Sequence, residues 1–378
     1  MTMTIQSEIF SVDLAGVIVG ETAISDVQGE AGVLSYRGIP ITELVDKPFQ
    51  EVVWLVVFGD WPNAQQSAQL LEYLIGNSAL KDRELELLRG LPASLHPMLM
   101  LQGMVPLLDL PESSTLGLPL DAEHGLYIAA KLSGLIAAHY RLAHDKDPLA
   151  AGSDKSFHDN FLTLFHGQPP TSDAVRMLDA AQILQMEHSF NAGTFAGRVC
   201  ASTLAPIQSS ISASIGTLFG RLHGGADQAA LEMAMAIGSP DAAADYVVET
   251  LARREKIMGM GHREYRTVDP RAKLLKPMAV TLCQEPDSKR LLATLVAVEE
   301  ACQAAFSVRG KEIWANVEFY KGAVFHSLGI PTQNFTAMFA MARVYGYIAH
   351  FLEFRQESRL IRPRARYASS HGNQGAAA

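Results

Sequence analysis

The chain contains 378 residues and has a mass of 41.0 kDa, which is enough to bury a large hydrophobic core. Hydrophobic residues make up 48% and charged residues 19%, a composition that excludes both a disordered chain and a coiled-coil rod. The formal net charge of −9 argues against attraction of the whole molecule to nucleic acid or to an anionic membrane.

The N-terminal part of the chain predicts a short β region without a secretory signal. Residues 1–14 lack a basic segment followed by an apolar stretch, and the apolar run at residues 52–58 is too short to cross a bilayer. Short strands are expected around residues 17–19 and 32–36, separated by polar residues and glycines. The three cysteines, at positions 200, 283 and 302, have no CxxC spacing, which is typical of a reducing compartment, so we expect a cytoplasmic protein.

Helical patterns dominate the rest of the chain. Pro48 predicts a helix start, because a proline in the first turn needs no amide donor, and Gly59 predicts the end of the same helix. Further helices are expected from Pro97 to residue 108, over residues 122–143, and from Ser172 towards Glu187. Strands do not alternate with helices as a parallel sheet requires, so the predicted fold class is mainly α.

The glycine pattern predicts a division into two helical domains. Glycines are concentrated at residues 220–225 and recur at Gly322 and Gly329, although no obvious linker interrupts the chain. We expect residues 1–222 and 326–378 to form a large domain. Residues 223–325 would form a smaller domain, both of whose borders lead back to the larger one.

Positive charge is concentrated in two segments of this acidic protein. Guanidinium groups match carboxylates and phosphates, so the clusters predict one or more small ligands with several negative charges. A solvated basic face is the more common explanation of a charge run alone. The first cluster is Arg253, Arg254, Lys256, His262, Arg263, Arg266, Arg271, Lys273 and Lys276, and the second is Arg355, Arg359, Arg362, Arg364 and Arg366.

The first cluster surrounds the segment Met258-Gly259-Met260-Gly261-His262. The two glycines would let the backbone approach a ligand closely and would place the histidine at its rim. The segment is not a dinucleotide fingerprint, because a third glycine and a preceding strand are missing.

Two more histidines and one acid are candidates for chemistry. His223 precedes paired glycines and His188 follows the helix expected from Ser172, and each by itself is more often a structural residue. Glu318 stands between a valine and a phenylalanine, where desolvation would raise its pKa towards the range of a general base; an exposed edge residue is the alternative. No HExxH, P-loop or G-x-S-x-G motif occurs and the other histidines lack metal-ligand spacing, so we expect no metal.

Taken together, these segments resemble the citrate synthase family over nearly the whole chain. Each motif is weak alone, but their order along the chain is specific. The length is similar to that of the short bacterial and archaeal type. The matching segments are Leu14-Ala15-Gly16-Val17-Ile18-Val19, Glu21-Thr22-Ala23-Ile24-Ser25, Tyr36-Arg37-Gly38, His96-Pro97-Met98, Leu222-His223-Gly224-Gly225-Ala226, Ile257-Met258-Gly259-Met260-Gly261-His262-Arg263, Asp269-Pro270-Arg271-Ala272-Lys273, and Ile361-Arg362-Pro363-Arg364 with Tyr367.

The resemblance implies an enzyme that condenses an acyl-CoA thioester, usually acetyl-CoA, with oxaloacetate and then hydrolyses citryl-CoA. It assigns removal of the thioester methyl proton to Glu318, a hydrogen bond to the enol oxygen to His223, and polarisation of the oxaloacetate carbonyl to His262. Coenzyme A is a co-substrate, and no tightly bound cofactor is implied. The other implied contacts are His188, Arg271, Arg343 and Arg362 for oxaloacetate, and Arg266, Met258, Gly259 and Gly261 for coenzyme A.

The resemblance also implies a homodimer, because in the family the residue that matches Arg362 enters the site from the neighbouring subunit. A small domain closes over the large one and expels water before an enol forms.

The sequence departs from the family pattern close to the expected base. The family has aspartate at the position of Glu318, serine at that of Lys321 and proline at that of Arg221, and Ser189 stands where an acidic or small polar residue is common. The extra methylene moves the carboxylate by about one bond length, and misplacement on the order of 1 Å can cost a hundredfold in rate. Three hypotheses follow: a citrate synthase adjusted to glutamate, an enzyme for another acyl-CoA such as propionyl-CoA giving 2-methylcitrate, and a non-catalytic protein that retains the ligand pocket.

Overall fold

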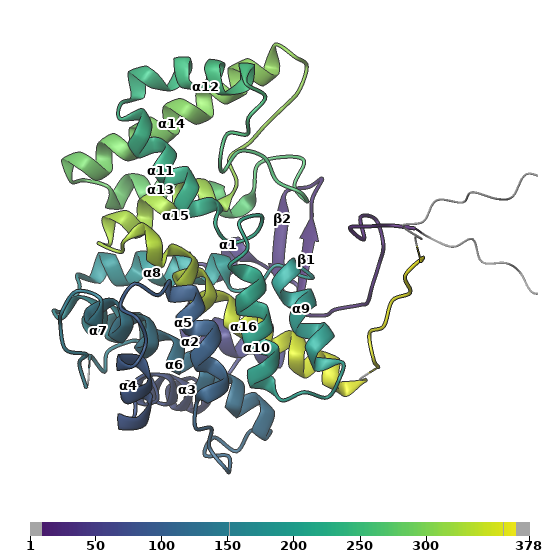
Figure 1. Cartoon of the computed structure of the whole chain (residues 1–378), viewed down its shortest axis with the longest axis vertical. Helices are drawn as coiled ribbons and strands as arrows, with labels where there is room; N and C mark the ends of the chain where they lie inside the picture. Colours follow the sequence, from purple (N-terminus) through teal and green to yellow (C-terminus); the bar gives the residue numbers. More distant parts are fainter. Residues whose placement is uncertain (1–9, 151, 358, 368–378) are drawn as a thin grey trace, which may run out of the picture.

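The computed structural model describes residues 10–150, 152–357 and 359–367, and this part of the chain is mainly α-helical (Figure 1). The predicted fold class is therefore confirmed. The helices are α1 (Ile41–Leu44), α2 (Phe49–Phe58), α3 (Ala64–Gly76), α4 (Asp82–Arg89), α5 (Pro97–Met104), α6 (Leu120–Leu142), α7 (Phe157–His166), α8 (Ser172–Gln185), α9 (Ala192–Ala201), α10 (Ile207–Leu218), α11 (Ala226–Ile237), α12 (Ala243–Ala252), α13 (Pro270–Leu282), α14 (Pro286–Ser307), α15 (Val317–Ser327) and α16 (Phe335–Gln356), with 3₁₀ turns at Val105–Leu107, Pro240–Ala242 and Thr332–Asn334.

The strands in the described residues form a small antiparallel sheet in the order β1-β2-β3, with β1 at Ser25–Gln28, β2 at Val33–Tyr36 and β3 at Ile39–Pro40. The expectation of a strand at residues 17–19 is wrong. Ile18 and Val19 are 90% and 43% exposed, so these residues have no buried face that a strand would cover. The partner of β2 is instead the segment that immediately precedes it, reached through a tight turn in which Gly32 has a φ of +63°.

Proline and glycine mark the ends of helices much as predicted. α2 follows Pro48 at its N-cap and ends before Gly59, whose φ of +96° is left-handed. α5 begins at Pro97, as expected, but it stops at Met104 rather than at residue 108. The physical reason is Pro106, which has no amide hydrogen to donate and whose ring crowds the carbonyl four residues earlier.

The two helices predicted further along the chain are also present. α6 occupies the region expected for residues 122–143. α8 begins at Ser172, and the cap is the preceding Thr171, whose hydroxyl accepts a hydrogen bond from the Ala174 amide at 3.2 Å. α8 ends at Gln185, so Glu187 lies just beyond it rather than in its last turn.

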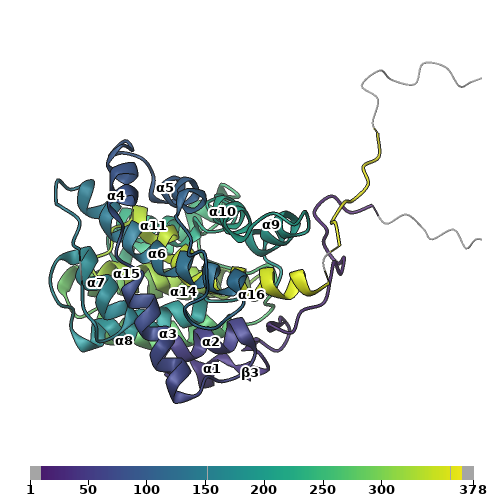
Figure 2. The same cartoon turned by 90° about the horizontal axis from the view of Figure 1, so that it is seen from below.

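Two groups of helices lie at opposite ends of the molecule (Figure 1). Helices α11 to α14 form one end and α2 to α7 form the other, with α8, α15 and α16 between them. α16 runs through the middle, where it packs against α2, α6, α8, α9 and α10 (Figure 2). Residues 335–351 of α16 are all buried, as expected for a helix with other helices on every side.

The two ends of the described chain leave the helical body on the same side (Figures 1 and 2). The Arg366 guanidinium lies 5.2 Å from the centroid of the Phe10 ring. Residues 359–367 have no regular secondary structure, and the side chain of Arg362 is exposed. Within the described residues, no helix has the length and apolar character needed to cross a membrane.

Candidate active site

Asp269 joins the N-terminal ends of α13 and α15. Its carboxylate caps α13 by accepting a hydrogen bond from the Arg271 amide at 2.9 Å, and it accepts another from the Val317 amide at 3.1 Å. The same carboxylate accepts hydrogen bonds from Arg271 Nε at 3.0 Å and Nη2 at 2.8 Å. The Asp269 and Arg271 side chains are 1% and 3% exposed, so this ion pair fixes a guanidinium in the protein interior beside the start of α15.

Both members of this pair are charged at neutral pH. Burial by itself raises the pKa of Asp269, but the charge and hydrogen bonds of Arg271 outweigh it and hold the pKa below its usual value. Burial lowers the pKa of Arg271, but Asp269 outweighs it and raises the pKa above its usual value. Because either ion alone would be an uncompensated buried charge, each depends on the other to remain in the interior.

The glycine-rich segment before His262 is bound to the segment before Glu318. Met260 and Ala315 form an antiparallel bridge, Gly261 donates its amide to the Trp314 carbonyl at 2.8 Å, and Asn316 donates its own to the Gly259 carbonyl at 3.0 Å. Two chain segments more than fifty residues apart are thereby held in register, and the half-buried Met258 lies at the start of this contact.

Gly259 serves the packing of these two segments. Its φ is +77°, and a Cβ at this position would lie 2.7 Å from Cδ2 of Phe319. Glycine at this position therefore allows the first turn of α15 to approach closely. Gly261, with a φ of +86°, has no such close neighbour, since the nearest atoms belong to Ile313 at 3.9 Å.

His262 is a neutral imidazole with a defined tautomer. Its Nδ1 accepts hydrogen bonds from the amides of Glu264 and Tyr265 at 3.0 and 3.2 Å, so the hydrogen of the neutral ring is on Nε2. That Nε2 lies 3.4 Å from Nη2 of Arg271. Burial, and then the charge of Arg271, lower the pKa of His262 to about 4. The ring is therefore a neutral hydrogen-bond donor next to a fixed guanidinium.

His188 lies beside His262, and the charge of Arg343 acts on His188. The centroids of the His188 and His262 rings are 5.5 Å apart, and His188 Nε2 is 3.1 Å from the Tyr265 hydroxyl. Arg343 is buried on α16 and donates Nε to the Gln185 carbonyl at 2.7 Å. Burial, followed by the charges of the two neighbouring arginines, holds the pKa of His188 well below its usual value, so this ring is also neutral.

The loop that carries His223 is packed tightly against α16. A Cβ on Gly224 would lie 2.5 Å from the Leu218 carbonyl oxygen and 2.9 Å from Cγ2 of Thr336, so only glycine fits there without a shift. The Gly224 carbonyl also accepts a hydrogen bond from the Thr336 hydroxyl at 3.1 Å. Close packing against the first turn of α16 therefore determines where the histidine lies.

His223 donates its single N–H to a neighbouring amide. Its Nε2 is 3.2 Å from Oδ1 of Asn191, an oxygen that can only accept, so the neutral ring has its hydrogen on Nε2. Burial, followed by the charges of Arg343 and Lys321, lowers the pKa of His223 to about 4. The ring is neutral at pH 7, and its donor is engaged by Asn191 through a hydrogen bond at the long end of the usual range.

Glu318 lies in the first turn of α15 and is 9% exposed. Asn316 caps the helix, with its Oδ1 accepting the Glu318 amide at 3.0 Å. The Glu318 carboxylate forms an ion pair with the ammonium of Lys321, one turn along the same helix. The Lys321 side chain is fully buried, and its Nζ lies 4.1 Å from the centroid of the Phe339 ring on α16.

The Phe339 ring lies between His223, Lys321 and Arg343. Its ring centroid is 6.4 Å from that of His223 and 4.8 Å from the guanidinium carbon of Arg343, in addition to its contact with Lys321. Together with the pairings around Asp269, these contacts make one continuous group. The residues that the structure brings together are His188, His223, His262, Arg271, Glu318 and Arg343.

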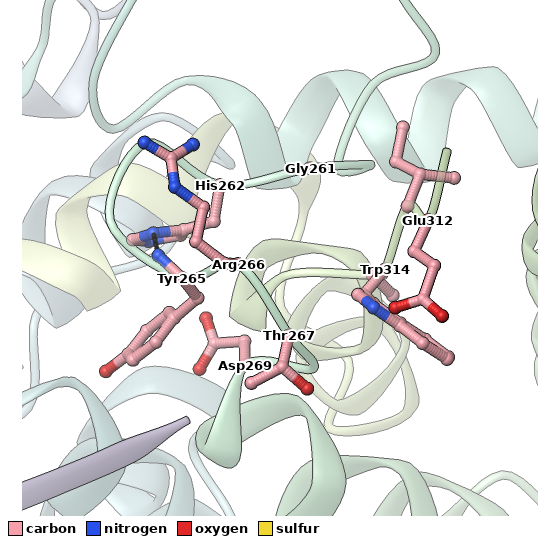
Figure 3. A pocket seen from close by; sticks show the side chains of 10 residues that line it. Gly261, His262, Tyr265, Arg266, Thr267, Asp269, Glu312 and Trp314 are labelled. Atoms are coloured by element: carbon pink, nitrogen blue, oxygen red, sulfur yellow. Dashed lines mark hydrogen bonds between the residues drawn. The ribbon is translucent and has the colours of Figure 1, made fainter. Parts of the chain in front are cut away.

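Two of the residues predicted from the sequence lie apart from this group. Arg362 is exposed in the segment that leaves the helical body, so the structure does not place it in the site of its own chain. Arg266 is exposed as well, but it lies at the edge of a cavity of about 160 Å³ beside His262. In Figure 3, Arg266, Tyr265 and Asp269 are on one side of this cavity, and Glu312 and Trp314 face them from the other. Among the described residues, no three His, Cys, Asp or Glu side chains are grouped as ligands for a metal ion.

Four residues that organise the site were not among the candidates from the sequence, namely Asp269, Asn191, Tyr265 and Phe339. A local signal existed for Asp269, because an aspartate before a proline is a typical start of a helix. The contact of Asn191 with His223 and that of Tyr265 with His188 join positions 32 and 77 residues apart, and no sequence pattern marks them.

We expect the stability of the unliganded protein to fall as the pH drops from 7 to 5. His223 and His262 have pKa values of about 4 in the folded protein, against an ordinary value of 6.5. Between these two pKa values the unfolded state therefore binds more protons than the folded state, so a lower pH favours unfolding. Each ring contributes about 2 kcal/mol of this loss. Urea unfolding of the purified protein at the two pH values measures the difference.

The contribution of one ring is isolated by substitution. His223→Gln should reduce the difference between the two pH values, whereas His144→Gln, which changes an exposed ring, should leave it unchanged. A pH dependence that is equal in both variants and the wild type would contradict the assignment of a buried neutral His223.

A mainly helical chain that brings three neutral histidines, two buried arginines and a carboxylate to one place has the make-up of an enzyme for small anionic substrates. The family model described as citrate synthase, C-terminal domain, matches residues 13–364 of this chain. The chain therefore belongs to the citrate synthase family.

Individual relatives agree with this assignment. The citrate synthase of Deinococcus radiodurans is 34% identical over 360 residues, which cover 94% of this chain and 95% of the relative. The 2-methylcitrate synthase of Shewanella oneidensis is 35% identical over 364 residues, which cover 94% and 93%.

Solved structures show the same fold. The citrate synthase of Thermotoga maritima superposes with a TM-score of 0.86 at 32% identity, covering 98% of both chains. A ternary complex of the Thermoplasma acidophilum citrate synthase with carboxymethyl-CoA and oxaloacetate superposes with a TM-score of 0.87 at 27% identity, covering 96% of this chain and 97% of that one.

Proposed function

We propose that this protein condenses acetyl-CoA with oxaloacetate and hydrolyses the resulting thioester, giving citrate and free coenzyme A. The observation that carries the proposal is the meeting of His223, His262 and Glu318, which come from three separate segments, around buried arginines. Two neutral donors and one carboxylate next to fixed cations are the groups that an enolisation beside a dianionic acceptor needs.

Oxaloacetate is bound through its two carboxylates. Arg271 and Arg343 are buried cations whose positions are fixed by Asp269 and by the Gln185 carbonyl, so they offer preorganised charge. His188 lies between them and contributes a neutral hydrogen-bonding ring. His262 uses its Nε2–H to polarise the carbonyl of the 2-oxo acid, and its low pKa keeps it a neutral donor at pH 7.

Enolisation of acetyl-CoA requires a base and a donor on opposite sides of the thioester. Glu318 accepts the methyl proton while the C–H electron pair moves into the enolate, whose negatively charged oxygen receives a hydrogen bond from His223. Because Asn191 holds the single N–H of this ring in the free protein, the thioester oxygen replaces Asn191 as the acceptor when the substrate binds. The enol carbon then attacks the oxaloacetate carbonyl, and water cleaves citryl-CoA to citrate and the free thiol.

Coenzyme A is placed along the loop that carries His262. The exposed Arg266 beside the cavity suits a phosphate group, and Gly261 lines the cavity. The half-buried Met258 lies three residues before Gly261 in the same segment. The part of Gly259 in this proposal is indirect, since its close neighbour is Phe319 rather than open space.

The complete site requires a second subunit and a closing motion. We place Arg362 in the site of the partner of a homodimer, which agrees with the exposure of its side chain. Residues 223–325 act as the small domain that closes over residues 1–222 and 326–378, with the hinge after α15 in the loop around Gly329. The three free cysteines are in keeping with a cytoplasmic location.

Two other functions are each favoured by one observation. The Shewanella oneidensis relative is a 2-methylcitrate synthase, which favours propionyl-CoA as the thioester. The ion pair between Glu318 and Lys321 occupies the carboxylate of the expected base, which favours a protein that binds the ligands without turnover.

One assay separates these functions. Purified protein is mixed with oxaloacetate and either acetyl-CoA or propionyl-CoA, and free coenzyme A thiol is followed over time. We expect the larger kcat/KM with acetyl-CoA and no thiol when oxaloacetate is omitted. A larger kcat/KM with propionyl-CoA would make the protein a 2-methylcitrate synthase. No thiol with either substrate, together with calorimetric binding of oxaloacetate, would make it a non-catalytic binder.

A further inference from the structure

Lys321 forms the second buried ion pair of the site, after that of Asp269 and Arg271. It follows Glu318 by three residues on α15, so both side chains project from the same face of the helix, and the ammonium pairs with the glutamate carboxylate. The lysine side chain is 0% exposed and that of the glutamate 11%, so water competes little for either partner. A pair in this setting holds its geometry far more firmly than an ion pair on the protein surface.

The packing around Lys321 restricts where its ammonium can go. Nζ lies over the Phe339 ring at 4.1 Å from the centroid, and the Arg343 guanidinium carbon lies 4.8 Å from the centroid of the same ring. The like charge of Arg343 disfavours movement of the ammonium towards it, and the aromatic ring blocks another direction. The carboxylate of Glu318 is the anionic group that the ammonium contacts, and it is also the group assigned to proton removal.

We propose that Lys321 is a positioning residue for Glu318, and that the two residues form a matched pair in which the ammonium selects one rotamer of the longer acid and keeps its carboxylate ionised. This inference rests on the proposed function, in which Glu318 is the base. It explains how the site holds the longer, more flexible acid in one position.

The reach of glutamate explains why a positioning partner matters here. Glutamate is longer than aspartate by one C–C bond of about 1.5 Å, and it has one more rotatable bond. An unrestrained glutamate would populate several positions for its carboxylate, of which few suit proton removal. An aspartate at the same place would be too short for the present contact, and Lys321 would then be buried without a close counterion.

The charge balance of the reaction is also compatible with the pair. As the C–H bond breaks and the O–H bond forms on Glu318, the carboxylate becomes neutral and the negative charge moves to the thioester oxygen. No proton moves to or from Lys321 in this step, so the net charge of the site is the same before and after the transfer. Because the ammonium contacts the carboxylate directly, it weakens Glu318 as a base while it holds it in place.

Other charged groups also face Glu318, and the test must separate them from Lys321. Arg271 on α13 interacts with the Glu318 charge, and Asp269 accepts the Val317 amide at the start of the same helix. Arg343 on α16 and the neutral His223 lie beyond Lys321. Lys321 also contributes to the low pKa of His223, so the pH profile of a Lys321 variant has to be compared with a direct titration of the Glu318 carboxyl.

Two single variants, their double variant and the wild type test the match through kcat/KM for thiol release. Glu318→Asp alone should lower kcat/KM by about a hundredfold, because it misplaces the carboxylate and strands Lys321. The double variant Glu318→Asp with Lys321→Ser should recover at least about tenfold of that loss. If Lys321→Ser alone lowers the rate and the two effects simply multiply in the double variant, the matched pair is wrong.

The pH profile gives a readout that a purely structural lysine would not change. In Lys321→Met the acidic limb of kcat/KM should move to higher pH by about one unit, because the carboxylate loses its cation. Lys321→Arg, which keeps the charge, should leave the limb in place, and so should Lys289→Met, which removes an exposed lysine from α14. An unmoved limb in Lys321→Met would overturn the proposal; if that variant does not fold, Lys321→Gln replaces it.

A measurement without turnover separates this inference from the proposed function. In protein with ¹³C-labelled glutamate carboxyls, the Glu318 signal is identified by its loss in Glu318→Gln. It should titrate at lower pH in the wild type than in Lys321→Met. Failure of the wild type to release thiol would refute the proposed function but leave this comparison intact, whereas equal titration in both proteins would refute the pair even in an active enzyme.

Discussion

Glu318→Gln should lower the rate of thiol release from acetyl-CoA and oxaloacetate by about a thousandfold. The amide has nearly the shape of the carboxylate but cannot take up the methyl proton, so the enol does not form. The substitution also leaves the Lys321 ammonium buried without its counterion, which costs on the order of 3 kcal/mol in stability. Turnover is therefore measured well below the midpoint of thermal unfolding, with calorimetric binding of oxaloacetate as evidence of an intact site.

A second buried glutamate provides the matched control for this substitution. Glu299 on α14 accepts a hydrogen bond from Lys276 at 2.7 Å and another from the Tyr320 hydroxyl, so Glu299→Gln also removes a buried carboxylate from an ion pair. That variant should lose stability but keep most of its turnover. If Glu318→Gln retained a tenth or more of the wild-type rate, Glu318 would not be the base.

Asp269→Asn should destabilise the folded protein by about 3–5 kcal/mol, as measured by urea unfolding. The substitution keeps the size of the side chain and one carbonyl oxygen, but it removes the charge that balances Arg271 in the interior. It also weakens the cap of α13 and the hydrogen bond from the Val317 amide, which together hold the starts of α13 and α15 side by side. We expect oxaloacetate binding to weaken in parallel, because Arg271 loses the partner that orients it.

The surface pair between Arg83 and Asp109 shows how much of this effect depends on burial. Its N–O distance is 3.1 Å, close to that of the Asp269 pair, but its side chains are 70% and 45% exposed. Asp109→Asn should therefore change stability by less than about 1 kcal/mol. A comparable loss in the two aspartate variants would contradict the argument that desolvation makes the Asp269 pair decisive.

Much of the local structure could be predicted from the sequence, because the cause lies within a few residues. Pro48 and Pro97 mark helix starts and Gly59 a helix end, since proline lacks an amide hydrogen and glycine adopts a left-handed conformation without strain. Two predictions of local structure are wrong. α5 ends earlier than expected because of Pro106, which is a local cause. Residues 17–19 have β-branched side chains but no neighbouring strand among the residues that the structure describes.

The order of the motifs around His223, His262 and Glu318 indicated which side chains were available for the chemistry. The protonation state of each group could not be read from that order, because it depends on the side chains that cover the group in the folded protein rather than on its neighbours along the chain. Lys321 could be seen as an unusual residue, but its burial under Phe339 depends on the packing of α15 against a different helix. The neutral state of His262 likewise depends on burial and on Arg271, which Asp269 holds in a region that water does not reach.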